Sequence, residues 1–139
     1  MTPALADALV AAVTEILEVA AFELGDAAAP VAPPDDAVAT TIAFHGPPSG
    51  TVRVWIDAAE ARAFAVATLG CDDPEPAVIA DAVRELTNMI AGHVLGRVWP
   101  DVCIALDGAA LGAASPADTY AVHVSGDHGR IAVGMEVAS

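Results

Sequence analysis

The 139-residue sequence predicts an α+β fold, mainly an antiparallel β-sheet packed with three helices. Two observations favour it. Apolar residues recur at helical spacing in the N-terminal segment and on one face of the segment from Pro74 to Gly96, and strand-like segments come in pairs joined by short turns. The expected order of elements is α-β-β-α-α-β-β-β, which differs from the strand-helix alternation of a doubly wound sheet. At this length we expect a single domain over residues 1–139.

The N-terminal segment predicts an amphipathic helix that ends near Gly25. Thr2 suits the N-cap and Pro3 suits the first helical position. An apolar stripe then follows at helical spacing, formed by Leu5, Leu9, Val13, Ile16, Leu17 and Ala20. The next segment, Asp26 to Asp36, contains three prolines and a run of alanines, so we expect an exposed linker loop there.

A β-hairpin is expected after this loop. Ala37 to His45 and Thr51 to Ile56 have strand character, and the five residues between them are typical turn formers. A second helix follows directly, because Asp57 and Glu60 have the spacing of a capping box and Gly70 stops the helix.

The third helix is predicted to run from Pro74 to about Gly96. Asp73 supplies a cap, Pro74 a first helical residue, and Glu75 an acid near the positive end of the helix dipole. Pro100 blocks any continuation. Three strand-like segments complete the chain, namely Val102 to Leu106, Thr119 to Ser125 and Arg130 to Val137.

The charge balance excludes several classes of function. Nineteen acidic residues stand against five arginines, which gives a net charge of −14, and the chain has no lysine. Phosphate backbones and anionic membranes attract clustered basic residues, so we expect no nucleic-acid and no membrane partner. Chemistry that needs a lysine nucleophile is impossible.

The N-terminus and the cysteines indicate a cytoplasmic protein. Met1 to Leu17 has no basic start, and Asp7 and Glu15 interrupt its apolar residues, which fits neither a signal peptide nor a membrane span. Two cysteines, Cys71 and Cys103, are too few for a disulfide framework, so we expect free, buried thiols.

One face of the third helix carries the functional signal. At about 100° per residue, Asp81, Glu85, Asn88 and Gly92 fall on one side. The opposite arc is apolar and contains Ile79, Ala82, Val83, Leu86, Ile90 and His93. The acids could simply be solvated surface residues. However, asparagine is a mediocre helix former and glycine costs about 1 kcal/mol relative to alanine, so two such residues on one face indicate a surface that something approaches closely.

Asp81-x3-Glu85-x2-Asn88, continuing as Met-Ile-Ala-Gly92, resembles the signature helix of the CheX, CheC and FliY family of chemotaxis phosphatases. The order of the surrounding elements is also similar. The resemblance implies a CheC-like fold and the hydrolysis of the aspartyl phosphate on a response-regulator receiver domain. The motif occurs once, because the first helix offers only Glu15 and Glu18 at the matching spacing. A single copy implies the CheX-like branch and a homodimer joined through its sheets.

The resemblance, together with the chemistry of an acyl phosphate, suggests a role for each ridge residue. The receiver domain is expected to supply Mg²⁺ and cationic groups, so the protein needs no cofactor or metal of its own. Asn88 would hold the attacking water, because an amide both donates and accepts without repelling the phosphoryl group. Glu85 would pair with a cation of the partner. Asp81 would support this anchoring or only aid solubility, and Gly92 would leave room for the partner's backbone.

Two departures from the family pattern, the single copy of the motif and a missing proline, keep a second hypothesis open. The family motif usually continues to a proline about two dozen residues after the asparagine, whereas Ala110 stands there and the nearest prolines are Pro100 and Pro116. The chain could therefore be a non-catalytic module that docks on a receiver domain or another signalling protein. A metal site built from the histidines is a weaker alternative, since their spacing matches no tight ligand pattern. Those histidines are His45, His93, His123 and His128.

Overall fold

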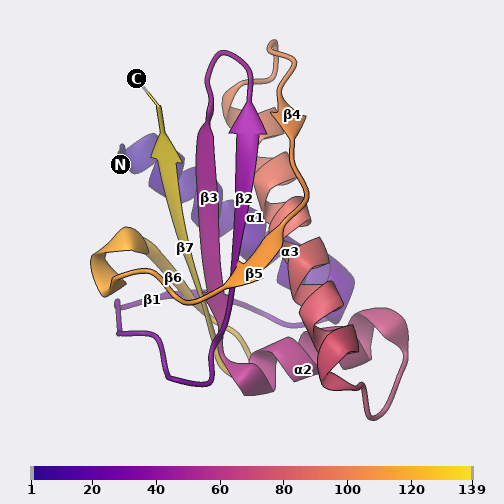
Figure 1. Cartoon of the computed structure of the whole chain (residues 1–139). Coiled ribbons are helices and arrows are strands. Elements are labelled where there is room, and N and C mark those ends of the chain that lie inside the picture. Colours follow the sequence, from indigo (N-terminus) through magenta and orange to yellow (C-terminus); the bar gives the residue numbers. More distant parts are fainter. Residues whose placement is uncertain (1, 139) are drawn as a thin grey trace.

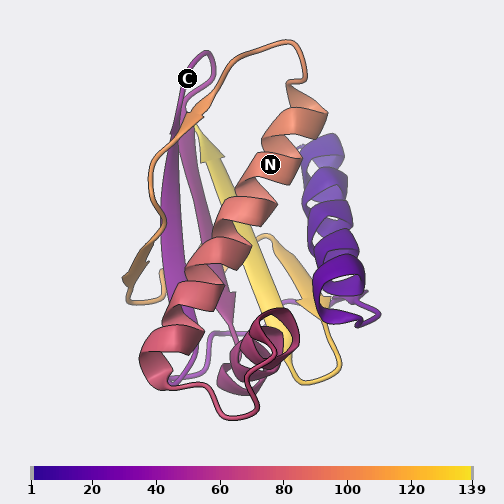
Figure 2. The same cartoon turned by 90° about the vertical axis from the view of Figure 1, so that its right-hand side faces the viewer.

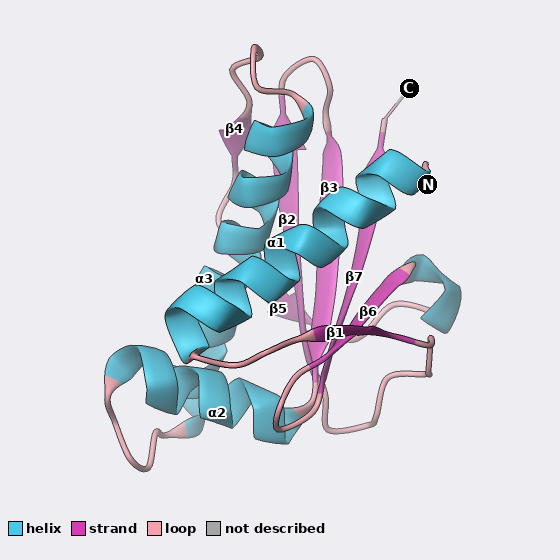
Figure 3. Cartoon of the chain, turned by 180° about the vertical axis from the view of Figure 1, so that it is seen from behind, coloured by secondary structure: helices cyan, strands magenta, loops and turns pink. Residues whose placement is uncertain are grey.

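The computed structural model describes residues 2–138 and shows three helices packed on one face of a seven-stranded sheet (Figures 1 and 3). Met1, the first residue of the predicted N-terminal segment Met1 to Leu17, and Ser139 lie outside the described residues. The helices are α1 (Pro3–Ala21), α2 (Ala58–Leu69) and α3 (Pro76–Val98), with a short 3-10 helix, η1, at Ala117–Thr119. The strands are β1 (Asp26–Ala28), β2 (Val38–His45), β3 (Gly50–Ile56), β4 (Ala105–Leu106), β5 (Ala110–Gly112), β6 (Val122–Ser125) and β7 (Arg130–Val137). The predicted α+β class and order of elements are confirmed.

The sheet is antiparallel throughout, in the order β1-β6-β7-β3-β2-β4, with β5 also paired to β2. The hairpin of β2 and β3 forms its centre, and β7 pairs along the whole of β3. The two short strands β4 and β5 lie against different parts of β2, which they approach at Phe44 and Thr40. One edge of the sheet is therefore made of two short strands, both contributed by the chain that follows α3.

The core lies between the sheet and the helices. The predicted stripe of α1 is confirmed, since Leu9, Val13 and Leu17 are completely buried. The predicted cap is also present, because the backbone N–H of Leu5 donates to Thr2 Oγ1 at 3.2 Å. The helix ends earlier than predicted. Phe22 adopts the left-handed conformation, with φ at 57°, and it takes the capping place expected of Gly25.

Local sequence patterns placed several element ends wrongly. The expected linker 26–36 begins with β1, because Asp26 to Ala28 pair with β6. The predicted strand from Val102 to Leu106 contains only the two-residue β4. In the predicted strand from Thr119 to Ser125, Thr119 belongs to η1 and β6 begins at Val122, and β5 was not predicted. These short strands depend on partners far along the chain, which no local pattern encodes. The third helix starts at Pro76 instead of Pro74, and the carboxylate of Asp73 accepts from Arg62 at 3.2 Å.

Both predicted cysteine thiols are free, but they are exposed and not buried. Cys71 follows the glycine that ends α2, and Cys103 lies in the loop after α3, so neither reaches the core. Among the described helices, none is long and apolar enough to span a membrane.

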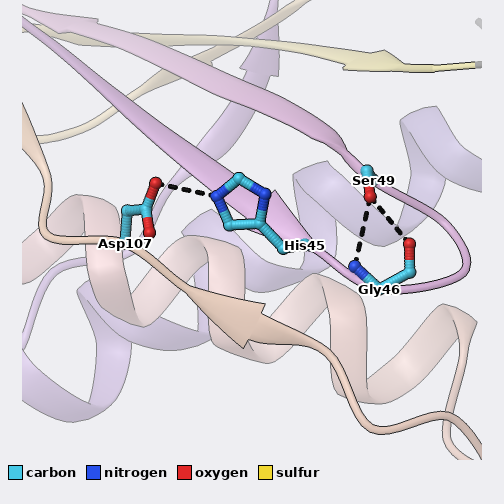
Figure 4. Close-up of polar contacts among 4 residues, drawn as sticks. All are labelled: His45, Gly46, Ser49 and Asp107. Carbon is cyan, nitrogen blue, oxygen red and sulfur yellow. Dashed lines mark hydrogen bonds and ion pairs between the residues drawn. The ribbon is translucent and has the colours of Figure 1, made fainter.

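The tip of the β2–β3 hairpin is held by side chains (Figure 4). Ser49 Oγ accepts from the backbone N–H of Gly46 and donates to the Gly46 carbonyl, at 3.1 and 2.7 Å. His45 Nε2 lies 2.8 Å from Asp107 Oδ2, which ties the end of β2 to the chain just after β4. These contacts hold the β4 edge beside the C-terminal part of α3.

The predicted capping box of α2 is wrong. Asp57 makes no side-chain cap; its Oδ2 instead accepts from the backbone N–H of Arg130 at 2.7 Å. Glu60 is completely buried under the β6–β7 turn, where its Oε1 lies 3.5 Å from the N–H of His128. The neighbouring Glu23 accepts from the N–H of Asp127 at 2.8 Å. Glu60 and Glu23 therefore bind the β6–β7 turn, and the predicted capping of α2 by Asp57 and Glu60 does not occur.

The turn sits closely on this pair of acids. A Cβ atom added to Gly126 would lie 2.0 Å from Glu60 Oε1 and 3.0 Å from Glu23 Oε1. Glu60 Oε2 has no hydrogen-bond partner among the described residues. Burial raises the pKa of the Glu60 carboxyl to about 8, and the neighbouring Glu23 and Asp127 carboxylates act in the same direction. The carboxyl is therefore mainly protonated in the folded protein near neutral pH.

This raised pKa predicts a stability that falls as the pH rises. The folded chain binds the Glu60 proton more tightly than the unfolded chain, whose pKa is near 4.5. The stabilisation is complete below that value and is lost as the pH approaches 8, a change of a few kcal/mol. The free energy of unfolding, measured with urea from pH 5 to 8.5, should fall with rising pH in the wild type. It should depend less on pH in Glu60→Gln. Glu75→Gln, at an exposed glutamate, should keep the wild-type slope, and an unchanged slope in Glu60→Gln would contradict the assignment.

Candidate functional site

The outer side of α3 forms an uncovered ridge. In Figure 2, α3 lies in front, with the strands on one side and α1 on the other. Asp81, Glu85 and Gly92 are exposed on this side and Asn88 is half-buried. The opposite side is buried in the core, and Val83, Leu86 and Ile90 have no exposed surface. The structure thus brings the four predicted site residues together on one face, as expected.

A buried hydroxyl pair fixes how α3 is rotated. Thr87 is completely buried, and its Oγ1 lies 2.5 Å from Thr40 Oγ1 on β2. The Thr87 hydroxyl donates to the carbonyl of Val83 at 2.9 Å, so Thr40 donates to Thr87. Because successive helical residues differ by about 100°, burying Thr87 against the sheet turns the next residue, Asn88, toward the surface. Thr87 was not among the predicted site residues, because a threonine inside a helix carries no local signal of its partner.

Ion pairs with α1 hold the C-terminal half of α3. Glu15 of α1 lies 2.8 Å from His93 Nε2 and 3.5 Å from Arg97 Nη1. His93 was expected in the apolar core, but it is half-buried at the boundary between the two helices, where it meets this carboxylate. Glu15 occupies the position where a second copy of the motif would place its glutamate. In this chain that position serves packing between helices.

The ridge residues differ in their electrostatic surroundings. Asp81 accepts from the Arg84 guanidinium one turn away, so its charge is partly balanced. Within residues 2–138, the ion pairs of acidic side chains do not include Glu85. Among residues 2–138, the polar side-chain contacts of α3 involve Asp81, Arg84, Thr87, His93 and Arg97, and none involves the Asn88 amide. The ridge therefore presents one unpaired carboxylate and, one turn later, one unpaired amide.

Two hollows flank the ridge. The one beside Glu85 has a volume of about 370 Å³ and is mainly apolar; it is lined by Ala20, Phe64, Thr68, Leu69, Asp81, Ala82, Glu85 and Met89. We call it the α1–α2–α3 groove. The second lies beside Gly92 and Trp99 and has a volume of about 210 Å³. A Cβ atom added to Gly92 would meet nothing within 4 Å, so this glycine is not required by internal packing.

The four histidines considered as metal ligands lie apart. His45 pairs with Asp107, His93 pairs with Glu15, and His128 belongs to the exposed turn after β6. His123 is buried with its ring centroid 5.7 Å from that of Trp55, and burial lowers its pKa. In the described part of the chain, no three His, Cys, Asp or Glu residues are grouped so that they could hold a metal ion.

The fold is that of CheX-like and CheC-like chemotaxis proteins of known structure. CheX from Desulfovibrio desulfuricans is 21% identical with a TM-score of 0.77, and the match covers 97% of this chain and 99% of that one. A CheC-like superfamily protein from Shewanella sp. PV-4 is 15% identical with a TM-score of 0.74, and both chains are covered completely. A chain of the CheX-CheY-BeF3-Mg²⁺ complex from Borrelia burgdorferi is 14% identical with a TM-score of 0.72, and the coverage is 96% and 97%.

Residues 38–133 match the family described as "Chemotaxis phosphatase CheX". This match runs from the start of β2 to the middle of β7, including all of α3 and its ridge, and it comprises more than half of the chain. The protein belongs to the CheX family. No curated protein sequence matches it.

The hydroxyl pair that orients the ridge predicts strong coupling between two substitutions. Thr87→Val alone leaves the buried Thr40 hydroxyl without its acceptor and should cost about 1–3 kcal/mol of the free energy of unfolding. Thr40→Val alone should cost less, because the Thr87 hydroxyl still donates to the Val83 carbonyl. The double variant should cost clearly less than the sum, because replacing both partners leaves no unpaired hydroxyl.

Denaturant unfolding of the two single variants and the double variant measures this coupling. Thr41→Val, on the adjacent, half-buried position of β2, is the control and should change stability by less than about 0.5 kcal/mol. Additive costs in the double variant would show that the hydroxyl contact does not hold α3 on the sheet.

Proposed function

We propose that this protein accelerates hydrolysis of the aspartyl phosphate on a CheY-like receiver domain of a response regulator. The supporting observation is the free Asn88 amide, one turn after the unpaired Glu85 carboxylate, on a helix face that no other element covers. Membership of the CheX family supports the reaction class. The similar fold of a chain in a CheX-CheY-BeF3-Mg²⁺ complex supports the kind of partner. The proposal places both proteins in the cytoplasm.

The reaction requires little from the protein besides placing a water molecule. The water oxygen attacks phosphorus while the bond from phosphorus to the aspartyl oxygen breaks, so inorganic phosphate and a free aspartate carboxylate result. We propose that the receiver supplies Mg²⁺ and the cations that balance the phosphoryl oxygens. The Asn88 carbonyl oxygen can accept from the water and its N–H can donate to a neighbouring oxygen. The amide does this without adding a negative charge next to the phosphoryl group.

Glu85 is proposed to anchor the helix in the receiver's active site. Its carboxylate lies three residues before Asn88, about 4.5 Å along the helix axis. An unpaired carboxylate on a protruding helix can bind a lysine or arginine of the partner, and this pair fixes the register of the amide. Asp81 is proposed to assist from one turn earlier, although its pair with Arg84 already balances part of its charge. Gly92 leaves the surface after Asn88 low enough for a partner's backbone to approach.

The proposed division of roles predicts different kinetic effects for the two central residues. Asn88→Ala should lower the rate of dephosphorylation at saturating receiver about a hundredfold, because a water-positioning group contributes about 2–3 kcal/mol to the barrier. Its affinity for the phosphorylated receiver should stay close to that of the wild type. Glu85→Ala should instead weaken binding as well as turnover. Loss of phosphate from a ³²P-labelled receiver, followed over a range of receiver concentrations, measures the maximal rate and the apparent affinity.

Glu136→Ala is the matched control, since Glu136 is an exposed acid on β7, on the other side of the molecule. It should behave like the wild type. An Asn88→Ala variant that retains full turnover would contradict the water-positioning role. A wild-type protein that binds phosphorylated receivers without accelerating their hydrolysis would favour the non-catalytic docking module.

We also propose that two copies form a dimer joined through their sheets, as the single-motif CheX-like branch suggests. Short strands form both edges of the sheet, and Leu111 of β5 exposes an apolar side chain at one of them. Edge strands offer free backbone groups for pairing with another chain. Sedimentation equilibrium at micromolar concentration should give about twice the 13.9 kDa mass of one chain. A mass of one chain across the concentration range would contradict the dimer.

A further inference from the structure

The α1–α2–α3 groove brings together residues from three helices beside the proposed catalytic ridge. Phe64 and Ala82 form buried parts of its lining, whereas Leu69, the last residue of α2, is 56% exposed. Met89, next to Asn88 in the chain, is half-buried in it. The groove is therefore an open apolar depression on the surface, with Glu85 on its border.

The C-terminal end of α1, which contributes Ala20 to the groove, exposes several large apolar side chains. Val19, Phe22 and Leu24, at the C-terminal end of α1 and just beyond it, are each more than 75% exposed. Ala20 lies between them and lines the groove. Large apolar side chains gathered at one end of a protein commonly mark a surface that a partner covers. Of this segment, Ala20 lines the α1–α2–α3 groove, whereas Phe22 lines a neighbouring hollow between α2 and the β6–β7 turn.

The position of Glu85 indicates which partner covers the groove. Glu85 belongs both to the ridge and to the groove lining, so a receiver whose active site lies over Asn88 and Glu85 also lies over the groove. The two charged residues of the lining, Asp81 and Glu85, are both acidic. Since Arg84 balances Asp81, the unpaired charge at the border is that of Glu85. A segment that is apolar and carries an adjacent lysine or arginine complements this surface, whereas an acidic segment is repelled.

We propose that the α1–α2–α3 groove binds an apolar side chain of the receiver domain, next to a basic residue that faces Glu85, and that this contact selects among receivers. The inference rests on the proposed function and adds a specificity site to it. The groove touches no reacting atom, so its residues contribute to affinity and not to the chemical step. Leu69 is a specificity-determining residue under this proposal and has no catalytic role.

The test uses Leu69→Asp and Leu69→Ala in the full chain. Leu69 is mostly exposed, so both variants should fold, which circular dichroism and thermal unfolding verify. Leu69→Asp should raise KM for the phosphorylated receiver about tenfold while kcat changes less than twofold, and Leu69→Ala should have a smaller effect of the same kind. Val31→Asp is the matched control, because Val31 is an apolar residue, 46% exposed, outside the groove and the ridge. It should leave both constants unchanged.

A second measurement separates this inference from the proposed function. Titration with a receiver loaded with beryllium fluoride and Mg²⁺ reports binding without turnover. Weaker binding of this receiver by Leu69→Asp supports the proposed role of the groove, whether or not the wild type is a phosphatase. A wild type that hydrolyses nothing contradicts only the proposed phosphatase activity. If the wild type is active and both Leu69 variants keep its KM and its affinity for the loaded receiver, the proposed role of the groove is contradicted. The proposed phosphatase activity is then unaffected. If Leu69→Asp changes the sedimentation mass but not receiver binding, the groove serves contact between copies of this chain. That outcome also contradicts the proposal.

Discussion

Burial of the inner face of α3 is the constraint on which the rest of the site depends. This helix packs on the central strands and against both other helices, and its apolar residues close the core. The hydroxyl contact between Thr87 and Thr40 sets its rotation, because a buried hydroxyl must find a partner. Once Leu86 and Thr87 point inward, helical geometry leaves Glu85 and Asn88 pointing outward. The polar ridge is thus a direct consequence of how the core is filled.

The same packing decides which charges remain available at the surface. Glu15 on α1 is engaged with His93 and Arg97, and Asp81 is engaged with Arg84. The contacts of Glu15 link α1 to α3, and the pair within α3 balances part of the charge of Asp81. Glu85 stays unpaired beside an apolar groove, where an opposite charge from a partner would be less screened than on an open surface. Stability and recognition therefore use different acidic residues of the same helix pair.

Much of the site could be predicted from local patterns, and the failures have a common physical cause. The ridge of Asp81, Glu85, Asn88 and Gly92 follows from helical periodicity alone, and the structure places it as expected. Glu60 was misread because the spacing of a capping box is short and common, while its real partners come from the β6–β7 turn. His93 was misread because an apolar arc does not reveal a carboxylate on a neighbouring helix. The exposed cysteines and the late start of α3 have the same origin, since loops obtain their contacts from distant residues.

Amino-acid order by itself determined the helical and strand segments, the hairpin of β2 and β3, the acidic charge and the line of polar residues along α3. Each depends on residues within a few positions of one another, where chain geometry fixes the neighbours. Tertiary structure alone decided the pairing of β1 with β6 and of β5 with β2, the buried acids under the β6–β7 turn, the Thr40 partner of Thr87 and the groove beside Glu85. These features join residues tens of positions apart, and only the closure of the core brings such residues into contact.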